Sequence, residues 1–560
     1  MKRPHRTAVT APRLAEFDLA TITDPAVRRH VQQVLNVVED LAQTVAELRA
    51  ANQALRDEVA RLKGEQGQPD IRPAATSPLR DYSSEAERHT AKPRGPRPRR
   101  TARPVDRTET RLLERASLPA DARFKGYQRT VVQELVLRQE TIVFRRAKWY
   151  APSTGTTYVA PLPPGYTGQF GPELKRVALG LYWQSNVSEA ALLTVLRAAD
   201  IQIGAGTLSR LLTEERDVFT AEAAAVTAAG CASGAVQHLD ATGTRVNGQP
   251  EQCHVLCNAL YTSYRTLPGK DRLSVLTVLS GGRPRLHLAD ATAAAWLTQT
   301  GVAQRTQHVL AALPQAQVLD AATFEQLLGE LGADLGPQQQ QWLREATAVA
   351  AYRAGHLGPV VATLLTDDAP QEARLTEQQA LCWIHVGRHY KRLVPYTAAN
   401  QRLLAAFVTD FWAYYRELVA YRDAPTAAEA VRLGAAFDTL FNRQTGYVAL
   451  DDRIAKTRAK RAQLLLVLAQ PEVPLHNNAA ELGARRRVRK RDVSFGPRTA
   501  QGKAAWDTFQ TLVETTRKLG VQFGDYLRDR LVGGEQIPRL DVLLRSHAAA
   551  LQPAAYTATP

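Results

Sequence analysis

Three acidic side chains in this chain lie in sequence contexts that suit a divalent metal ion. Asp240 closes an apolar run that predicts a buried strand over 235–240. Asp367 follows a second such run, 360–365, and Glu481 stands at the start of a segment with a helical pattern. Carboxylates are hard oxygen ligands of the kind that Mg²⁺ and Mn²⁺ prefer. The three residues therefore predict a metal-binding triad.

Phosphodiester chemistry is the reaction that such a triad best serves. Two divalent ions about 3.5–4 Å apart can hold the attacking and the leaving oxygen of an in-line displacement at phosphorus. We expect Asp240 to bridge both ions, and Asp367 and Glu481 to hold one ion each. Asp368 remains an alternative to Asp367, because adjacent side chains of an extended segment point to opposite faces.

A dense basic run follows Glu481 and predicts contacts with phosphate groups. Six of the seven residues from 485 to 491 are basic, and no acid interrupts them. On a helix, a residue four positions after Glu481 lies on the same face one turn away. Guanidinium groups at that distance could hold phosphates beside the metal ions. The side chains predicted to bind DNA there are Arg485, Arg486, Arg489 and Lys490.

The bulk composition favours a cytoplasmic protein with an anionic partner. The 560 residues carry a formal net charge of +16, and release of counterions makes nucleic acid the leading candidate. Four cysteines are too few for a disulfide-stapled fold of this size, which fits a reducing cytosol. No apolar run approaches the ~20 residues that span a bilayer. We expect a nucleoid-associated protein and no membrane contact.

Cofactors other than the two Mg²⁺ or Mn²⁺ ions are not indicated. Cys382 and His385 form a Cys-x-x-His pair, which is half of a zinc site, and no matching pair lies nearby. Cys253 and Cys257 are interpreted as core residues. The chain contains no GxxxxGK[ST] loop for ATP. We therefore expect no zinc and no ATP.

The first domain, residues 1–63, is predicted to be a coiled coil. Apolar residues recur from Val31 to Leu62 at alternating steps of three and four, and Asn52 is the polar residue of this seam. A lone Asn at an a position favours two strands, so we expect a homodimer or a higher oligomer. The alternative is that the seam packs on the body of the same chain.

Three further segments precede the strand of Asp240. Residues 64–117 are rich in Pro and Arg and poor in large apolar residues, which predicts a disordered basic linker. Residues 118–170, with β-leaning pieces at 130–137, 141–144 and 157–160, predict a small β-rich module. Residues 171–230 are predicted to be helical, with Ser188 as an N-cap and a second helix over 205–212. This pair of helices is either a structural hairpin or a helix-turn-helix that offers Thr207, Ser209 and Arg210 to DNA.

The remaining chain predicts an α+β catalytic core with a large all-helical insertion. Strands over 235–240, 251–261 and 264–267, a helix over 272–279, a helical elaboration over 286–355 and a strand over 360–365 match the start of a ribonuclease H-like fold. In that order the first and fourth strands are neighbours, which would bring Asp240 and Asp367 together. The predicted domains are 231–380 for the first part of the core, 381–473 for the helical insertion, 474–535 for the helix of Glu481 with the C-terminal helices, and 536–560 for a tail.

Four motifs resemble those of the aspartate–aspartate–glutamate transposases of the insertion-sequence-66 family. They are HLDATG, TDDAPQ, LCWIHVGRHYKRL and PLHNNAAELGARR. The resemblance covers about residues 118–530. It implies a ribonuclease H-like core, Mg²⁺, and Asp240, Asp367 and Glu481 as catalytic acids. It also implies that Asn477 and Asn478 position the helix or DNA and that His385, with Arg388 near it, contacts DNA at the scissile phosphate.

One departure from the resemblance concerns the module at 118–170. Many relatives carry a cysteine-rich zinc module after the zipper, whereas this segment has no cysteine. We expect a degenerate, zinc-free module held by its apolar core. The residues expected in that core are Phe124, Tyr127, Phe144, Trp149 and Tyr158.

The sequence thus predicts a DNA transposase that binds terminal inverted repeats and target DNA, with accessory transposition proteins as possible partners. The triad would first cut the transposon end and then join its 3′-hydroxyl to the target. Two alternatives stay open. One is a domesticated or inactive derivative that binds DNA without cutting it, and the other is a ribonuclease H-like nuclease that never joins strands.

Overall fold

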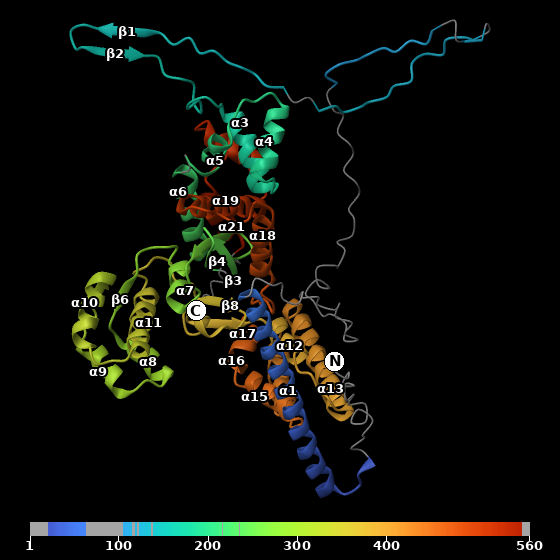
Figure 1. Ribbon diagram of the computed structural model, residues 1–560, viewed down its shortest axis with the longest axis vertical. Helices are drawn as coiled ribbons and strands as arrows, with labels where there is room; N and C mark the ends of the chain where they lie inside the picture. The colour runs from blue at the N-terminus through green and yellow to red at the C-terminus, as the bar shows by residue number, and fades with distance from the viewer. Residues whose placement is uncertain are drawn as a thin grey trace, which may run out of the picture.

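The computed structural model describes residues 21–62, 105–114, 118–119, 122–135, 138–214, 217–234 and 236–551. Most of the segment predicted as a basic linker lies outside the described residues. The chain forms a mixed α+β structure in which helices dominate and one mixed sheet of five strands lies at the centre (Figure 1). None of the described helices has the length and apolar character needed to cross a bilayer.

The central sheet has the strand order β5-β4-β3-β8-β9. Its first three strands form an antiparallel meander, and the last two run parallel to β3. The pair Gln237↔Leu364 sets β3 beside β8, which confirms that the strands preceding Asp240 and Asp367 are neighbours. The strands are β3 (Gln237–Val246), β4 (Gln249–Cys257), β5 (Thr262–Leu267), β8 (Thr363–Thr366) and β9 (Gln378–Leu381).

Strand β3 is longer than the predicted 235–240, so Asp240 lies within the strand and not at its end. The ladder with β4 continues to the pair Val246↔Gln249. Asn247 and Gly248 both have positive φ, 49° and 79°, as a two-residue hairpin turn requires. The predicted Asn-Gly hairpin is confirmed, and its tight turn is the reason that pairing extends past Asp240.

Two C-terminal helices pack on the sheet, and the first of them carries Glu481. Helix α18 (Asn478–Ser494) packs across β3 and β4, and α19 (Ala500–Lys518) packs on β5. A Cβ at Gly483 would lie 2.7 Å from Cγ1 of Val255, so glycine lets α18 approach the sheet closely. This approach brings the first turn of α18 to β3. Helix α7 (Arg272–Leu279) has the predicted bounds.

Two long insertions, here called the first and the second excursion, extend from the sheet (Figure 1). The first follows α7 and was predicted as helical over 286–355. It is mainly helical but also contains a two-stranded sheet, because the short apolar segments of β6 and β7 pair with each other. Its elements are β6 (Leu286–Leu288), α8 (Ala291–Thr300), α9 (Gln304–Ala312), β7 (Val318–Asp320), α10 (Ala321–Leu331) and α11 (Pro337–Arg353).

The second excursion lies between β9 and α18 and is entirely helical among the described residues from 383 to 473, as predicted. Its apolar side chains form a separate core around Trp383. Its helices are α12 (Trp383–Lys391), α13 (Ala398–Asp423), α14 (Ala427–Phe441), α15 (Val448–Arg458), α16 (Arg461–Leu464) and α17 (Leu466–Ala469).

Helix α1 (Pro25–Leu62) confirms the predicted N-terminal helix. It docks on the second excursion through a polar face. Oε1 of the buried Glu39 accepts hydrogen bonds from the backbone nitrogens of Tyr396 (2.9 Å) and Thr397 (3.1 Å) and from Nδ2 of Asn400 (3.0 Å). The heptad seam lies largely on the other side, and its residues Leu41, Leu48, Leu55 and Leu62 are exposed.

A helical unit precedes β3. Ser188 caps α4 (Glu189–Ala198) by accepting a hydrogen bond from the nitrogen of Ala191, as predicted, and α5 (Ala205–Thr213) follows after a short turn. The other helices of this unit are α3 (Pro172–Leu179), the π-helix η3 (Gly180–Gln184) and α6 (Asp217–Cys231).

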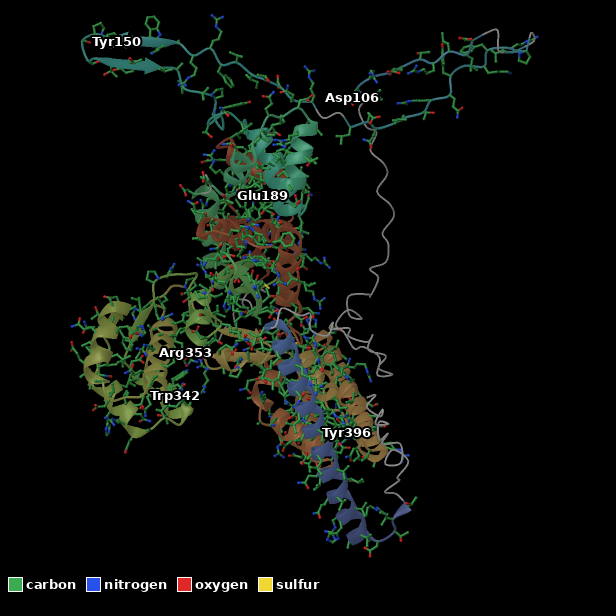
Figure 2. All side chains as sticks on the ribbon, in the orientation of Figure 1. Asp106, Tyr150, Glu189, Trp342, Arg353 and Tyr396 are labelled. Atoms are coloured by element: carbon green, nitrogen blue, oxygen red, sulfur yellow. The ribbon has the colours of Figure 1, made fainter. Side chains whose placement is uncertain are left out.

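The region predicted as a compact β-rich module has a different form. Its strands are β1 (Lys148–Ala151) and β2 (Thr156–Val159), and the described residues at 130–135 and 141–144 form no strand. The β1–β2 hairpin, here called the arm, projects away from the helices and carries Tyr150 (Figures 1 and 2). The predicted apolar core is wrong, because among the described residues of 118–170 no second layer covers the hairpin. Its intended members Phe124, Tyr127, Phe144, Trp149 and Tyr158 are all exposed.

The C-terminal segment 536–560, predicted as a tail, contains a packed helix. Helix α21 (Leu540–Leu551) lies against α6, and the side chains of Leu540 and Leu544 are fully buried. A further helix, α20 (Phe523–Leu531), connects α19 to this end of the chain. The apolar spacing at 540 and 544 places both leucines on one face, which explains the packing.

Candidate active site

The three predicted acids come from three different elements that the sheet brings together. Asp240 lies in β3, Asp367 directly follows β8, and Glu481 occupies the first turn of α18. Burial, together with the nearby charges of Asp367 and Glu481, raises the pKa of Asp240 to about 7. Asp240 therefore lies within electrostatic reach of Asp367 and Glu481, and the three carboxylates are here called the acid cluster.

Asp367, and not Asp368, faces this cluster. Oδ1 of Asp367 accepts a hydrogen bond from Nδ2 of Asn477 (3.0 Å) and lies 3.0 Å from Nδ1 of His385. The carboxylate of Asp368 turns to an ion pair with Lys460, and its backbone has a φ of +78°, in the left-handed region. The change of backbone direction after the strand separates the two neighbours. The alternative between them is therefore resolved by geometry in favour of Asp367.

Asn477 is the structural link between the acids. Its fully buried side chain donates from Nδ2 to the carbonyl of Leu239 (2.7 Å) as well as to Asp367. Its Oδ1 lies 3.2 Å from Nδ1 of His238, and its backbone nitrogen donates to Sγ of Cys382 (3.3 Å). Every side-chain polar atom thus has a protein partner. The prediction that Asn477 contacts DNA is wrong, whereas its expected positioning role agrees with these bonds.

His385 and Arg388 lie on α12 above two of the acids. Nδ1 of His385 is 3.8 Å from Oε1 of Glu481, and Nη2 of Arg388 is 3.4 Å from the same oxygen. Nη1 of Arg388 also lies 2.5 Å from Nε2 of the histidine. The two side chains therefore add cationic or donor groups beside the carboxylate of Glu481.

Two influences on the His385 ring oppose each other. Burial lowers its pKa, but the contacts with Asp367 and Cys382 raise the pKa to about 10, which favours the imidazolium. Arg388 can only donate, so its approach to Nε2 requires that nitrogen to accept. We favour the neutral ring with the proton on Nδ1, because two N–H groups cannot face each other at that distance.

The basic run on α18 divides into exposed and buried side chains. Arg485 and Arg489 are exposed, and Nη2 of Arg485 lies 3.5 Å from Oε2 of Glu481. Arg486 forms an ion pair with Glu514. Only the exposed members are free to meet phosphates from solution. Asn478 is also buried at 8% exposure, which leaves little of it for DNA.

Lys490 is a correction to the predicted DNA contacts. Its side chain is fully buried, donates to the backbone oxygen of Tyr182, and places Nζ 3.3 Å from the centre of the Tyr182 ring. The rings of Trp183 and Trp506 lie 5.3 and 5.9 Å away. Burial lowers the pKa of Lys490 to about 7. This lysine therefore anchors α18 to η3 and cannot reach DNA.

The residues predicted on the recognition helix lie on α5, in the helical unit before β3 (Figure 1). Arg210 is exposed, whereas Thr207 and Ser209 are half-buried. Nη2 of Arg210 lies 3.5 Å from Oγ1 of Thr207. These three side chains are not part of the acid cluster.

The donor set at the cluster fits divalent metal ions. Burial is the largest cause of the raised pKa of Asp240, the charges of Asp367 and Glu481 add to it, and a bound cation would offset both effects. Oxygen ligands of this kind suit Mg²⁺ or Mn²⁺. Asp367 also belongs to a second possible ligand group, with Cys382 and His385.

Comparison with known proteins places the chain in a family. The uncharacterized protein y4jO of Sinorhizobium fredii (strain NBRC 101917 / NGR234) is 32% identical to it over 291 residues, which cover 51% of this chain and 89% of y4jO. The chain belongs to the y4jO family. No family model and no solved structure matches it. The name of y4jO states no activity, so this relative does not indicate the chemistry of the site.

One acid near the cluster escaped the sequence interpretation. Glu372 lies in the short 3₁₀ turn Pro370–Glu372 after Asp367 and is 7% exposed. Burial raises its pKa to about 8, with contributions from Asp367 and Asp240, and its Oε2 is a buried atom without a hydrogen-bond partner. The sequence offers little signal for such a residue, because a turn has no periodicity. In this y4jO family member, the one sequence clue to Glu372 is its short spacing from the TDD motif.

Proposed function

We propose that this protein is a DNA transposase that cleaves and joins strands with a metal-dependent Asp240–Asp367–Glu481 triad. The observation that carries the proposal is the convergence of these acids from β3, β8 and α18. We further infer that the core is ribonuclease H-like. Its antiparallel meander, two parallel strands beside β3 and a glutamate-bearing helix across the sheet support this assignment.

Asp240, Asp367 and Glu481 would hold the divalent ions. When bound, such ions activate the attacking oxygen and stabilise the charge on the leaving oxygen of a phosphodiester. The role of the protein is to hold the carboxylates in position before DNA binds. Asn477 does so for Asp367, and the β3–β8 pairing does so for Asp240.

The residues around the triad are suited to a polyanionic substrate. Arg485 and Arg489 are the exposed cations of α18, and Arg388 is half-exposed beside Glu481. Guanidinium groups can bind phosphate with two parallel hydrogen bonds, which fixes the strand as well as attracting it. Arg210 on α5 offers a further cation for DNA.

We also propose that the protein works as a homodimer through α1. The helix uses a face centred on Glu39 to dock on its own chain, and the exposed leucines of the heptad seam remain for a second copy. An apolar seam of this length is stabilised when a second helix covers it. Dimerisation and docking therefore do not compete for the same face.

A strand-transfer assay tests the proposal. The substrate is a labelled duplex of the DNA that flanks the gene, with supercoiled plasmid as the target, in Mg²⁺. Wild-type protein should yield cleaved ends and joined products, and Asp240→Asn, Asp367→Asn and Glu481→Gln should yield far less of both. Cleavage without joining would instead identify a nuclease.

Binding provides the matched measurement. The three variants should still shift the DNA in a gel, because they retain the basic side chains. If wild-type protein binds this DNA but never cuts it, the protein is a binding derivative and the proposal fails.

A further inference from the structure

A second group of metal-ligand atoms lies at the margin of the acid cluster. One ligand atom each of Asp367, Cys382 and His385 lies within 4.8 Å of the others, and among the described residues no other group of three does so. Cys382 is the N-cap of α12, and His385 follows one turn later. This i, i+3 spacing turns both side chains toward Asp367 at the end of β8.

One of these atoms also lacks a hydrogen-bond partner. Nδ1 of His385 is buried and unsatisfied, although it lies 3.0 Å from Oδ1 of Asp367. The close contact is thus not aligned as a hydrogen bond. The two atoms lie close enough to each other to bind one cation between them.

The chemistry of the three donors discriminates between metals. A thiolate sulfur, an imidazole nitrogen and a carboxylate oxygen together suit Zn²⁺, whereas Mg²⁺ prefers oxygen ligands alone. The backbone nitrogen of Asn477 donates to the Cys382 sulfur (3.3 Å), and Cys382 is the N-cap of α12, so the sulfur is held in place beside the other two donors. Oε1 of Glu481, 3.8 Å from Nδ1 of His385, or a water could take the fourth position.

We propose that Asp367, Cys382 and His385 bind Zn²⁺ and that this binding switches the active site off. The inference rests on the proposed function, because Asp367 is shared between the two sites. A zinc ion on Asp367 takes away one of the three acids that the Mg²⁺ site requires. The expectation of no zinc came from the missing second pair in the sequence, and the fold supplies Asp367 in its place.

Arg388 opposes zinc binding in the present arrangement. A metal on Nδ1 of His385 requires the ring proton to move to Nε2, which Nη1 of Arg388 faces at 2.5 Å. The Arg388 side chain is 42% exposed and can turn toward solvent. Loss of this guanidinium should therefore strengthen zinc binding, whereas loss of Cys382 should weaken it.

Cobalt spectroscopy tests the site without any activity. Co²⁺ added to the full-length wild-type protein should produce a thiolate-to-cobalt charge-transfer band, which Cys382→Ser and Cys382→Ala should abolish. Cys231→Ser is the matched control, because Cys231 is buried in the main core away from the acids and its variant should keep the band. Absence of the band from folded wild-type protein, or its persistence in both Cys382 variants, would overturn the proposal.

Zinc titration tests the switch. DNA cleavage at fixed excess Mg²⁺ is measured as Zn²⁺ is added, and each variant is scaled to its own rate without zinc. Zinc should inhibit the wild type, with the midpoint more than about tenfold higher in Cys382→Ser and lower in Arg388→Ala. Equal midpoints in wild type and Cys382→Ser would contradict the switch. A cobalt band without DNA cleavage would locate the failure in the proposed function and not in the metal site.

Discussion

Asn477 and Asp367 lie 110 positions apart in the sequence, yet Nδ2 of Asn477 donates a hydrogen bond of 3.0 Å to Oδ1 of Asp367. The same amide binds the carbonyl of Leu239, next to Asp240. One buried side chain at the start of α18 therefore fixes the geometry of both strand-borne acids.

Replacement of Asn477 by Ala should reduce both stability and activity. The change leaves the buried carbonyl of Leu239 without its partner, which costs about 1–3 kcal/mol. Asp367 also loses the donor that holds it. Urea denaturation measures the first effect and DNA cleavage the second. Asn442→Ala, at the exposed end of α14, is the control: it removes one surface hydrogen bond from Arg458 (2.8 Å), so stability should change by about 0.5 kcal/mol or less and activity should not change.

The two adjacent aspartates should behave differently. Asp367→Asn removes a carboxylate from the cluster and should lower the cleavage rate on the order of 10²–10³-fold. Asp368→Asn weakens only the pair with Lys460, which is partly exposed, and should change the rate less than about tenfold. Single-turnover cleavage at saturating Mg²⁺ distinguishes them. An inactive Asp368→Asn beside an active Asp367→Asn would reverse the assignment.

The sequence predicted the acid cluster because its determinants are local patterns and strand order. The apolar runs before Asp240 and Asp367 set β3 and β8, and the meander between them makes these strands neighbours. The burial of Lys490 could not be predicted in this way. Its burial depends on Tyr182, 308 positions earlier, and no local pattern reports a contact at that distance. Glu372 was missed for the related reason that burial of a turn depends on the surrounding fold.

The arm shows the opposite error of sequence prediction, because residues expected to be buried there are exposed. Aromatic residues in a β-leaning segment predicted a core, but a core also requires a second layer. Trp149 and Tyr158 pair across the hairpin, and the arm gives them nothing further to pack on. Composition reports which residues could be buried, whereas the path of the chain decides which ones are.

Lys490 should make stability depend on pH. Burial lowers its pKa to about 7 in the folded state, from 10.5. Between these values the unfolded chain binds the extra proton, so the free energy of unfolding should rise with pH from about 7 to about 10.5. Lys490→Met lacks this group, and its curve should be flatter by roughly a few kcal/mol across that window. Parallel curves in urea denaturation would contradict the burial of the charge. Lys456→Met, at an exposed lysine on α15, is the control.

The two faces of α1 should have separable roles. Leu48→Glu with Leu55→Glu places charges in the exposed seam and should convert a dimer to a monomer. Glu39→Ala removes the acceptor for three hydrogen bonds to the second excursion and should leave the dimer intact. Analytical ultracentrifugation measures the oligomeric state of both variants. Loss of the dimer in Glu39→Ala alone would show that docking, and not the seam, holds the copies together.

The β1–β2 hairpin should contribute to DNA affinity. No acid occurs between Thr141 and Pro172, whereas Arg145, Arg146 and Lys148 lie beside the exposed ring of Trp149. Aromatic rings stack on bases and cations bind phosphates, so Trp149→Ala should weaken binding by about 1–3 kcal/mol if a base stacks there. Filter binding at two salt concentrations separates the contributions. Arg145→Ala with Arg146→Ala should reduce the salt dependence, while Trp149→Ala should leave it unchanged. Unaltered affinity in both variants would exclude the hairpin from the DNA interface.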